Sequence, residues 1–356
     1  MDWVTIGRLL LVVLVLLLWP AAWPVVESAG AAPQADPAQT QIDQGKGWLR
    51  QGDLPAAAEA ARKAIQLNPA SAEAQHLLGV VLLKERKADE AVDAFNKALK
   101  LKPAYADALN DLAEVYVIQG KSAEAEQALT RAIDVDAKHV ASYLDLAKLY
   151  EQRRDAAATK KTYQALLAVV PNQPDALFGL AIWYDRQGEA KAARDTLSRL
   201  TKIYPKHADA WYLSGRIAEK NNDLIEAAYA YKQAIAAKPD LVDAHYNLGF
   251  IYRSQNKPNE AERAFLEVLR YRPEYAEAHM NLGVVYTSVS KLDDAEHEYE
   301  TAVSLKPDYA EAHYNLGVFY ELYRKDMPRA LAQYRRYREL GGRDDRVERI
   351  VGSTFR

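Results

Sequence analysis

The sequence predicts an all-α solenoid built from about nine tandem helix-turn-helix repeats of 34 residues. Three stretches are near-copies of one another: residues 306–320, 272–286 and 238–252 read KPDYAEAHYNLGVFY, RPEYAEAHMNLGVVY and KPDLVDAHYNLGFIY. Proline recurs at multiples of the same 34-residue spacing, without a single insertion, at Pro69, Pro103, Pro171, Pro205, Pro239, Pro273 and Pro307. Because a helical hairpin of this size cannot bury its own apolar face, neighbouring hairpins are expected to stack.

Each repeat can be numbered so that this proline falls at position 32. The repeats then begin at residues 38, 72, 106, 140, 174, 208, 242, 276 and 310, and Ala137 fills the one slot that lacks proline. Position numbers below count from these starts. Proline cannot continue a helix, so position 32 is expected to end the second helix of every unit.

The first helix of each repeat is predicted from positions 4, 7, 8 and 11, which His313, Leu316, Gly317 and Tyr320 occupy in the last repeat. Their i, i+3, i+4, i+7 spacing forms one apolar stripe. Position 8 is glycine or alanine in every repeat, and we expect it to let two helix backbones approach closely.

The second helix carries alanine at position 20 in most repeats and a large residue at position 24, so small side chains meet large ones across each pair. A larger side chain at position 8 would overpack the close approach of the two helix backbones expected there and cost about 1 to 3 kcal/mol.

These motifs resemble the tetratricopeptide repeat (TPR) family, whose pattern is W-x-x-L-G-x-x-Y…A-x-x-x-F…P. The resemblance covers residues 38 to about 344 and implies a right-handed superhelix with a concave groove. The predicted organisation is therefore a signal peptide or membrane anchor at 1–31, a Pro/Ala linker at 32–37, nine repeats at 38–344 and a capping segment at 345–356. The ninth repeat carries one extra residue within YRKDMPRA, which moves its alanine to Ala330.

The N-terminal segment predicts export. Arg8 precedes an apolar run that ends near Val26, and Ala29-Gly30-Ala31 offers a small-residue cleavage signal. The apolar stretch is also long enough to span a bilayer if Arg8 reaches the interface, so a retained anchor stays open. Either alternative places the repeats in the periplasm or on the non-cytoplasmic side of a membrane.

Composition argues against several classes of function. The formal net charge is −3, which provides no basic field for nucleic acid, and cysteine is absent, which removes disulfides, thiolate metal sites and cysteine nucleophiles. His245, His279 and His313 all fall at position 4 of separate repeats, too far apart for ligands that zinc needs at about 2 Å. We expect no enzyme activity, no cofactor and no metal.

Two clusters of charge have a structural and a functional interpretation. Acidic residues recur at position 2, where they can bind a cation or a basic peptide, but the first turn of a helix favours acids in any case. Arginines between Arg335 and Arg349 can form an anionic-partner surface or a solvated cap, and acidic residues interleaved among them favour the cap.

A second face of the first helix is predicted to bind a partner. Positions 5, 9 and 12 lie about 80° to 140° from position 4, and in TPR superhelices that face lines the groove. In repeats seven to nine it is too apolar for plain solvent. The asparagines at position 6 beside it resemble the ladder that grips peptide backbone in the O-linked N-acetylglucosamine transferase family. The predicted groove residues are Tyr246, Asn247, Phe250, Met280, Asn281, Val284, Tyr314, Asn315 and Val318.

The sequence thus predicts an exported or membrane-tethered TPR scaffold that binds an extended segment of another protein. The alternative is an accessory subunit of an envelope enzyme, pilus or secretion complex that acts through its convex or C-terminal surface. In repeats four to six the groove carries charges of both signs, including Lys148, Asp185, Arg216 and Glu219, and is expected to prefer a different stretch of the partner. Partner identity and oligomeric state are not predicted.

Overall fold

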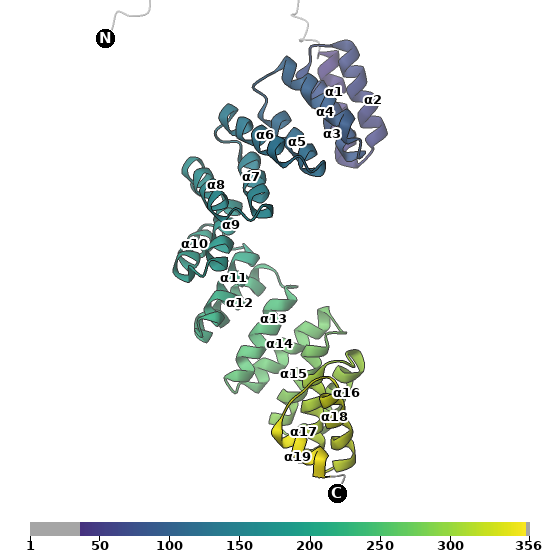
Figure 1. Cartoon of the computed structure of the whole chain (residues 1–356), viewed down its shortest axis with the longest axis vertical. Coiled ribbons are helices and arrows are strands. Elements are labelled where there is room, and N and C mark those ends of the chain that lie inside the picture. The colour runs from purple at the N-terminus through teal and green to yellow at the C-terminus, as the bar shows by residue number, and fades with distance from the viewer. Residues whose placement is uncertain (1–35, 354–356) are drawn as a thin grey trace, which may run out of the picture. The chain divides into compact units, whose positions relative to one another are not determined.

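The computed structural model describes residues 36–353, which form helices joined by short turns (Figure 1). The helices are α1 (Pro37–Gln51), α2 (Leu54–Leu67), α3 (Ala72–Lys84), α4 (Ala88–Leu101), α5 (Ala106–Ile118), α6 (Ser122–Val135), α7 (Val140–Gln152), α8 (Ala156–Val169), α9 (Pro174–Arg186), α10 (Ala190–Ile203), α11 (Ala208–Lys220), α12 (Leu224–Ala237), α13 (Val242–Ser254), α14 (Pro258–Tyr271), α15 (Ala276–Ser288), α16 (Leu292–Leu305), α17 (Ala310–Phe319), the π-helix η1 (Tyr320–Arg324), α18 (Met327–Glu339) and α19 (Asp345–Ser353).

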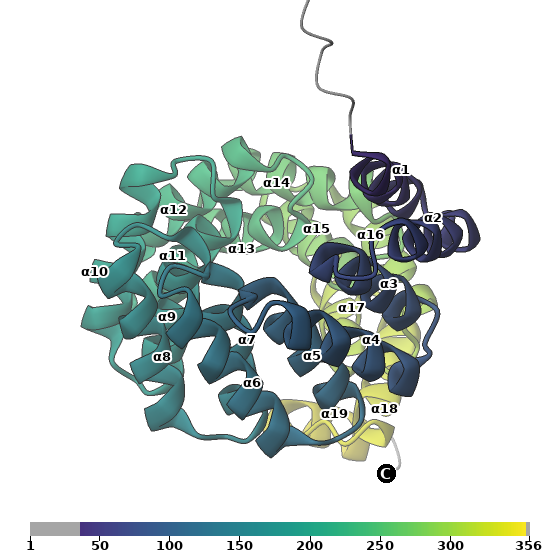
Figure 2. The same cartoon turned by 90° about the horizontal axis from the view of Figure 1, so that it is seen from above.

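Consecutive helices from α1 to α18 pack as nine hairpins within this described range, and the range contains no strand. The prediction of an all-α array of about nine helical hairpins is confirmed. The chain divides into two compact units after Pro103, with α1–α4 in the first unit and α5–α19 in the second. Within the second unit, α9, α11, α13 and α15 lie on the inner side of the curve, and α10, α12 and α14 lie on the outer side (Figure 2).

The small residue at position 8 has a different role from the predicted one. A Cβ added at Gly215 would lie 2.5 Å from the ring of Tyr231, and a Cβ at Gly283 would lie 2.8 Å from the ring of Tyr299. The glycine therefore makes room for the position-24 ring of its own hairpin rather than for a neighbouring helix backbone. The same contact occurs at Gly79, Gly249 and Gly317, against Phe95, Phe265 and Tyr334.

In repeats six to nine, the residue at position 4 ties the first helix to the turn before it. The ring nitrogen Nε2 of His245 lies 2.9 Å from the carbonyl oxygen of Pro239, six residues earlier, and His279 and His313 make the same contact at 2.9 and 3.1 Å. Trp211 donates from Nε1 to the carbonyl of Pro205 at 2.9 Å. A ring donor at position 4 thus satisfies the carbonyl of the helix-ending proline.

The turn inside each hairpin is built on one residue in the left-handed conformation. Position 15, shifted by one residue in the ninth repeat, has φ between 56° and 81° throughout the described repeats. The amide of the next residue then donates to a carbonyl of the last helical turn, as in Lys291 N to Tyr286 O at 2.9 Å. These residues are Gly52, Arg86, Gly120, Arg154, Gly188, Asn222, Asn256, Ser290 and Lys325.

The extra residue of the ninth repeat is absorbed in η1, where the helix widens to a π-helical turn before it reaches the left-handed Lys325. A single inserted residue is what such a π-bulge accommodates. Ala330 then falls in the same fully buried place as the other position-20 alanines. Beyond it, Asp344 accepts hydrogen bonds from the amides of Arg346 and Val347 and so begins the short closing helix α19.

The predicted signal peptide or anchor at 1–31 lies outside the described residues. Among residues 36–353, no helix has both the length and the apolar character needed to cross a bilayer.

The ring contact predicts a cost for enlarging position 8. Gly283→Ala is expected to destabilise the protein by about 1 to 3 kcal/mol, because the new methyl group overlaps the Tyr299 ring. Gly47→Ala is the control, since a Cβ there meets nothing within 4 Å and alanine favours a helix. Urea unfolding followed by circular dichroism measures both, and equal midpoints for the two variants would contradict this account of position 8.

At position 15, where the backbone is left-handed, a substitution is predicted to stabilise the protein rather than destabilise it. Ser290→Gly is expected to stabilise the protein by about 1 kcal/mol, because glycine adopts φ of 59° without the steric penalty that serine carries. Ser288→Gly, two residues earlier at the last residue of α15, is expected to destabilise by about 0.5 to 1 kcal/mol, because glycine loses more conformational freedom than serine in the helical conformation. Thermal unfolding of the two variants tests the difference in sign.

Candidate functional site

The predicted groove residues of repeats seven to nine come from α13, α15 and α17, and they differ in exposure. The ring of Phe250 is 40% exposed, and Tyr246, Asn247, Val284, Tyr314, Asn315 and Val318 are half-buried. Met280 and Asn281 are buried, with 2% and 1% of their surface exposed. Seven of the nine predicted side chains therefore present some surface, and α15 contributes the least.

The asparagine ladder is largely occupied by contacts inside the protein. Asn281 donates from Nδ2 to the Tyr246 hydroxyl at 3.1 Å and to the carbonyl of Glu277 at 2.7 Å, while its Oδ1 accepts from Arg253. These bonds use the amide on both sides and link α13 to α15. Asn315 donates to the sulfur of Met280 at 3.3 Å. Asn281 consequently serves the stacking of repeats seven and eight in this structure.

Asn247 is half-buried rather than buried, and its amide bonds to the core tyrosine of the preceding repeat. Its Nδ2 donates to the Tyr231 hydroxyl at 3.1 Å, and that hydroxyl donates to Glu219 at 2.7 Å. Because the single hydroxyl proton goes to the carboxylate, the phenol oxygen can only accept from Asn247, which fixes the orientation of the amide. Burial and the hydrogen bond to Glu219 raise the pKa of Tyr231, so the hydroxyl remains a donor at neutral pH.

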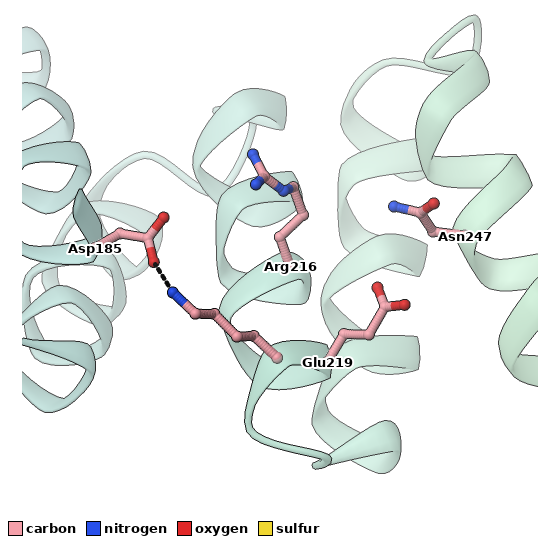
Figure 3. Close-up of a pocket in the computed structure, with 5 residues that line it drawn as sticks. Asp185, Arg216, Glu219 and Asn247 are labelled. Carbon is pink, nitrogen blue, oxygen red and sulfur yellow. Dashed lines mark ion pairs between the residues drawn. The ribbon is translucent and has the colours of Figure 1, made fainter. Parts of the chain in front are cut away.

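A cavity of about 490 Å³ opens beside this chain of hydrogen bonds (Figure 3). It is lined by Asp185 from α9, by Arg216, Glu219 and Lys220 from α11, and by Asn247 from α13. Figure 3 shows the α11 side chains between Asp185 on one side and Asn247 on the other. Three consecutive repeats thus contribute to one polar pocket, in the part of the groove where the sequence predicted charges of both signs.

The hydrogen bonding of the position-12 side chains in the groove depends on which residue occupies position 24 of the same repeat. Where position 24 is tyrosine, its hydroxyl bonds to the position-12 side chain. The pairs are Tyr163–Glu151 at 3.1 Å, Tyr231–Glu219 at 2.7 Å, Tyr299–Thr287 at 3.3 Å and Tyr334–Glu321 at 2.7 Å. In the repeat of Asp185, position 24 is Leu197, which has no hydroxyl. Asp185 instead makes a loose 3.8 Å ion pair with Lys220.

One contact that the sequence analysis did not foresee joins serine, histidine and aspartate. His139 lies 2.8 Å from the Ser142 hydroxyl through Nδ1 and 3.1 Å from Asp107 through Nε2. Ser142 is 0% exposed and donates its proton to Asn110 at 2.9 Å. Since no substrate reaches a fully buried hydroxyl, this network links α5 to α7 and is no nucleophilic site.

Comparison with protein-family models identifies the repeat. Tetratricopeptide repeat models match residues 42–106, 82–150, 150–217 and 242–275, and a TPR repeat model matches residues 215–253 and 285–322. The chain belongs to the tetratricopeptide repeat family. Proteins of this family are typically non-catalytic and mediate protein–protein interaction, which makes this chain a TPR interaction scaffold.

Several solved structures are similar to parts of this chain. The C-terminal part of a TPR repeat-containing protein from Cytophaga hutchinsonii is 15% identical, with a TM-score of 0.56 over 68% of this chain and 99% of that one. PilF from Pseudomonas aeruginosa is 25% identical, with a TM-score of 0.49 over 57% and 92%. MamA is 22% identical, with a TM-score of 0.44 over 49% and 96%. No curated protein matches the chain.

The arginines of α18 and of the segment that follows it are mostly engaged within the protein. Arg336 pairs with Glu339 at 3.0 Å, Arg338 with Glu348 at 2.9 Å and Arg346 with Glu321 at 2.6 Å. These ion pairs favour the solvated-cap interpretation of the cluster. Within residues 36–353, no group of three or more histidine, cysteine or acidic residues is placed to hold a metal ion.

Three of the first helices carry a histidine at position 4. Of these three, His279 is the one whose ring faces a carboxylate: Glu298 lies 2.6 Å from its Nδ1. Burial lowers the pKa of His279. The hydrogen bonds to Glu298 and to the carbonyl of Pro273 raise it, and together they outweigh burial, so the pKa of His279 is raised. Both ring nitrogens face acceptors, so the doubly protonated imidazolium fits the site best. In the next repeat, His313 faces the neutral Gln333 at 2.7 Å.

This pair predicts a pH dependence of stability. A histidine whose folded pKa is raised contributes stability that is fully present below its unfolded value of about 6.5 and is lost as pH rises through the folded pKa. Glu298→Gln recreates the His313–Gln333 contact without the charge, so its melting temperature is expected to fall less than that of the wild type between acidic and alkaline pH. Parallel pH dependences in the two proteins would contradict the role of Glu298.

Proposed function

We propose that this TPR protein is a non-catalytic scaffold that binds an extended segment of a partner protein along the inner face of α9, α11, α13, α15 and α17. The observation that carries the proposal is the cavity that Asp185, Arg216 and Asn247 line from three consecutive repeats. Its walls combine donors, acceptors and both signs of charge, which suits a polypeptide rather than a small apolar ligand.

The apolar part of the groove supports the same proposal. Phe250 lies one helical turn beyond Asn247 on α13 and is 40% exposed, with Arg253 stacked 4.8 Å from its ring centroid. Tyr246 and Tyr314 present part of their rings on the same positions of their helices. An extended segment that crosses from the polar pocket to these rings meets hydrogen-bonding groups first and apolar surface next, the combination found in peptide-binding surfaces.

The proposal includes export. Its support is the apolar run from Leu9 to Leu18 with Ala29-Gly30-Ala31 after it, and a composition without cysteine is compatible with a compartment of either redox state. Intact mass of the protein from its native cells distinguishes cleavage after Ala31 from a retained anchor. The C-terminal surface receives no separate proposal, because its arginines are paired internally.

Groove binding predicts a difference between two exposed apolar residues of one repeat. Peptides are selected from a random display library on the full-length protein in detergent, and their affinity is measured by fluorescence anisotropy. Phe250→Asp on the inner helix α13 is expected to weaken binding by about tenfold or more, since it places a charge in the apolar part of the groove. Leu266→Asp on the outer helix α14, where the side chain is 44% exposed, is the matched control.

Equal loss of affinity in both variants, or none in either, would place the binding surface elsewhere. Circular dichroism of each variant shows whether the helices persist. Asn281→Ala is unsuitable for this test, because the buried amide links two repeats and its removal changes the fold together with the groove.

A further inference from the structure

The pocket between α9, α11 and α13 contains two carboxylates that are partly shielded from solvent and two cations that are exposed. Glu219 is fixed by the Tyr231 hydroxyl at 2.7 Å, and Asp185 is 23% exposed on its side chain. Lys220, its partner, is 70% exposed and 3.8 Å away. Arg216 is exposed, and its guanidinium points away from the Asp185–Lys220 pair in Figure 3. A pair this exposed contributes little, so Lys220 can leave for water at small cost.

The geometry of repeat five leaves Asp185 without the role that its equivalents have. Glu151, Glu219 and Glu321 each accept a tyrosine hydroxyl from the second helix of their own repeat, and this bond helps to hold the hairpin. Leu197 provides no such donor to Asp185. A half-buried carboxylate has already lost part of its hydration, and it gains more from a new cation than a fully exposed one does.

We propose that this pocket recognises a charge pair in the bound segment: a basic side chain placed against Asp185 and Glu219, and an acidic side chain placed against Arg216. The inference rests on the proposed function and specifies the chemistry of the segment. Arginine is the preferred base, because a planar guanidinium can donate to two carboxylates at once. Asn247 lines the same pocket, and its Oδ1 can accept a backbone N–H of the segment.

The spacing of the two charges follows from α11. Arg216 and Glu219 are three residues apart, so their side chains are neighbours on the helix surface, about 5 to 6 Å apart at Cβ. In an extended segment, side chains two residues apart point to the same side and lie about 7 Å from each other. The segment is therefore expected to carry its basic and acidic residues with one residue between them.

The test uses short synthetic peptides with a central Arg-Ser-Glu or Glu-Ser-Arg unit flanked by Gly and Ser, both orders being made because the direction of the segment is open. Matched peptides replace Arg, Glu or both with Gln. Fluorescence anisotropy with the full-length protein is expected to show that one paired-charge peptide binds at least about tenfold more tightly than the doubly neutral one. Equal affinities across the set would overturn the inference.

Variants of the protein then assign each charge. Asp185→Asn combined with Glu219→Gln is expected to abolish the preference for Arg over Gln in the peptide, while the preference for Glu remains. The amide oxygen that Glu219→Gln introduces still accepts the Tyr231 hydroxyl, so the hairpin contact is kept. Arg216→Gln is expected to abolish the preference for Glu over Gln in the peptide, while the preference for Arg remains. Arg263→Gln, an exposed arginine of α14, is the control and should change neither preference. Retention of both preferences in the pocket variants would also overturn the inference.

Failure here can be separated from failure of the proposed function. If library-selected peptides lose affinity with Phe250→Asp but are indifferent to the pocket charges, the groove binds a segment of another chemistry, and only the charge-pair inference is wrong. If no peptide responds to Phe250→Asp either, both proposals are wrong.

Discussion

The packing of a position-24 ring onto a position-8 glycine helps to hold five of the hairpins together, and the pocket depends on the same contact. Tyr231 fills the space above Gly215, where an added Cβ would lie 2.5 Å from its ring. With the ring fixed in this way, its hydroxyl reaches Glu219 on one side and Asn247 of the next repeat on the other. A core contact of α11 and α12 therefore sets the orientation of two groups that face the groove.

This arrangement explains how a repeat protein can keep its fold and vary its surface. Tyrosine at position 24 uses an acceptor at position 12, as in Tyr163–Glu151. Phenylalanine or leucine there releases position 12 for another role, such as Arg253, which bonds Asn281 of the following repeat, or Asp185, which lies in the pocket. The residue that packs the core thus decides whether the groove residue of the same repeat is bonded within its own hairpin.

The two recurring geometries of the hairpin, the left-handed turn and the ring donor at position 4, act on backbone groups that would otherwise lack partners. The turn brings an amide to the last carbonyls of the first helix, and the donors of His245 and Trp211 reach the carbonyls of Pro239 and Pro205. Both work within a few residues of sequence. They make each repeat closely similar to the next and leave differences between repeats to the inner face.

The sequence by itself determined the repeat length, the hairpins and the ends of the second helices, because these follow from proline and from side-chain periodicity over one or two helices. The insertion in the ninth repeat was also visible, although its π-helical form was not. The role of position 8 was misjudged, since only packing shows that the Tyr299 ring occupies the space above Gly283. A left-handed residue at position 15 was signalled by Gly52, Gly120 and Gly188 but was not inferred.

Only the tertiary structure decided which groove groups are free to bind. Asn247 and Asn281 occupy the same repeat position and read alike in the sequence, yet the first is half-buried and lines the pocket while the second is 1% exposed. A tyrosine lies 35 residues before each of them, but the residue 28 positions earlier differs: it is Arg253 for Asn281, which it bonds when the repeats stack, and Glu219 for Asn247, which bonds Tyr231 instead. Hydrogen bonds of this kind depend on neighbours that no periodicity identifies, so a ladder of identical residues in sequence becomes a set of unequal sites in space.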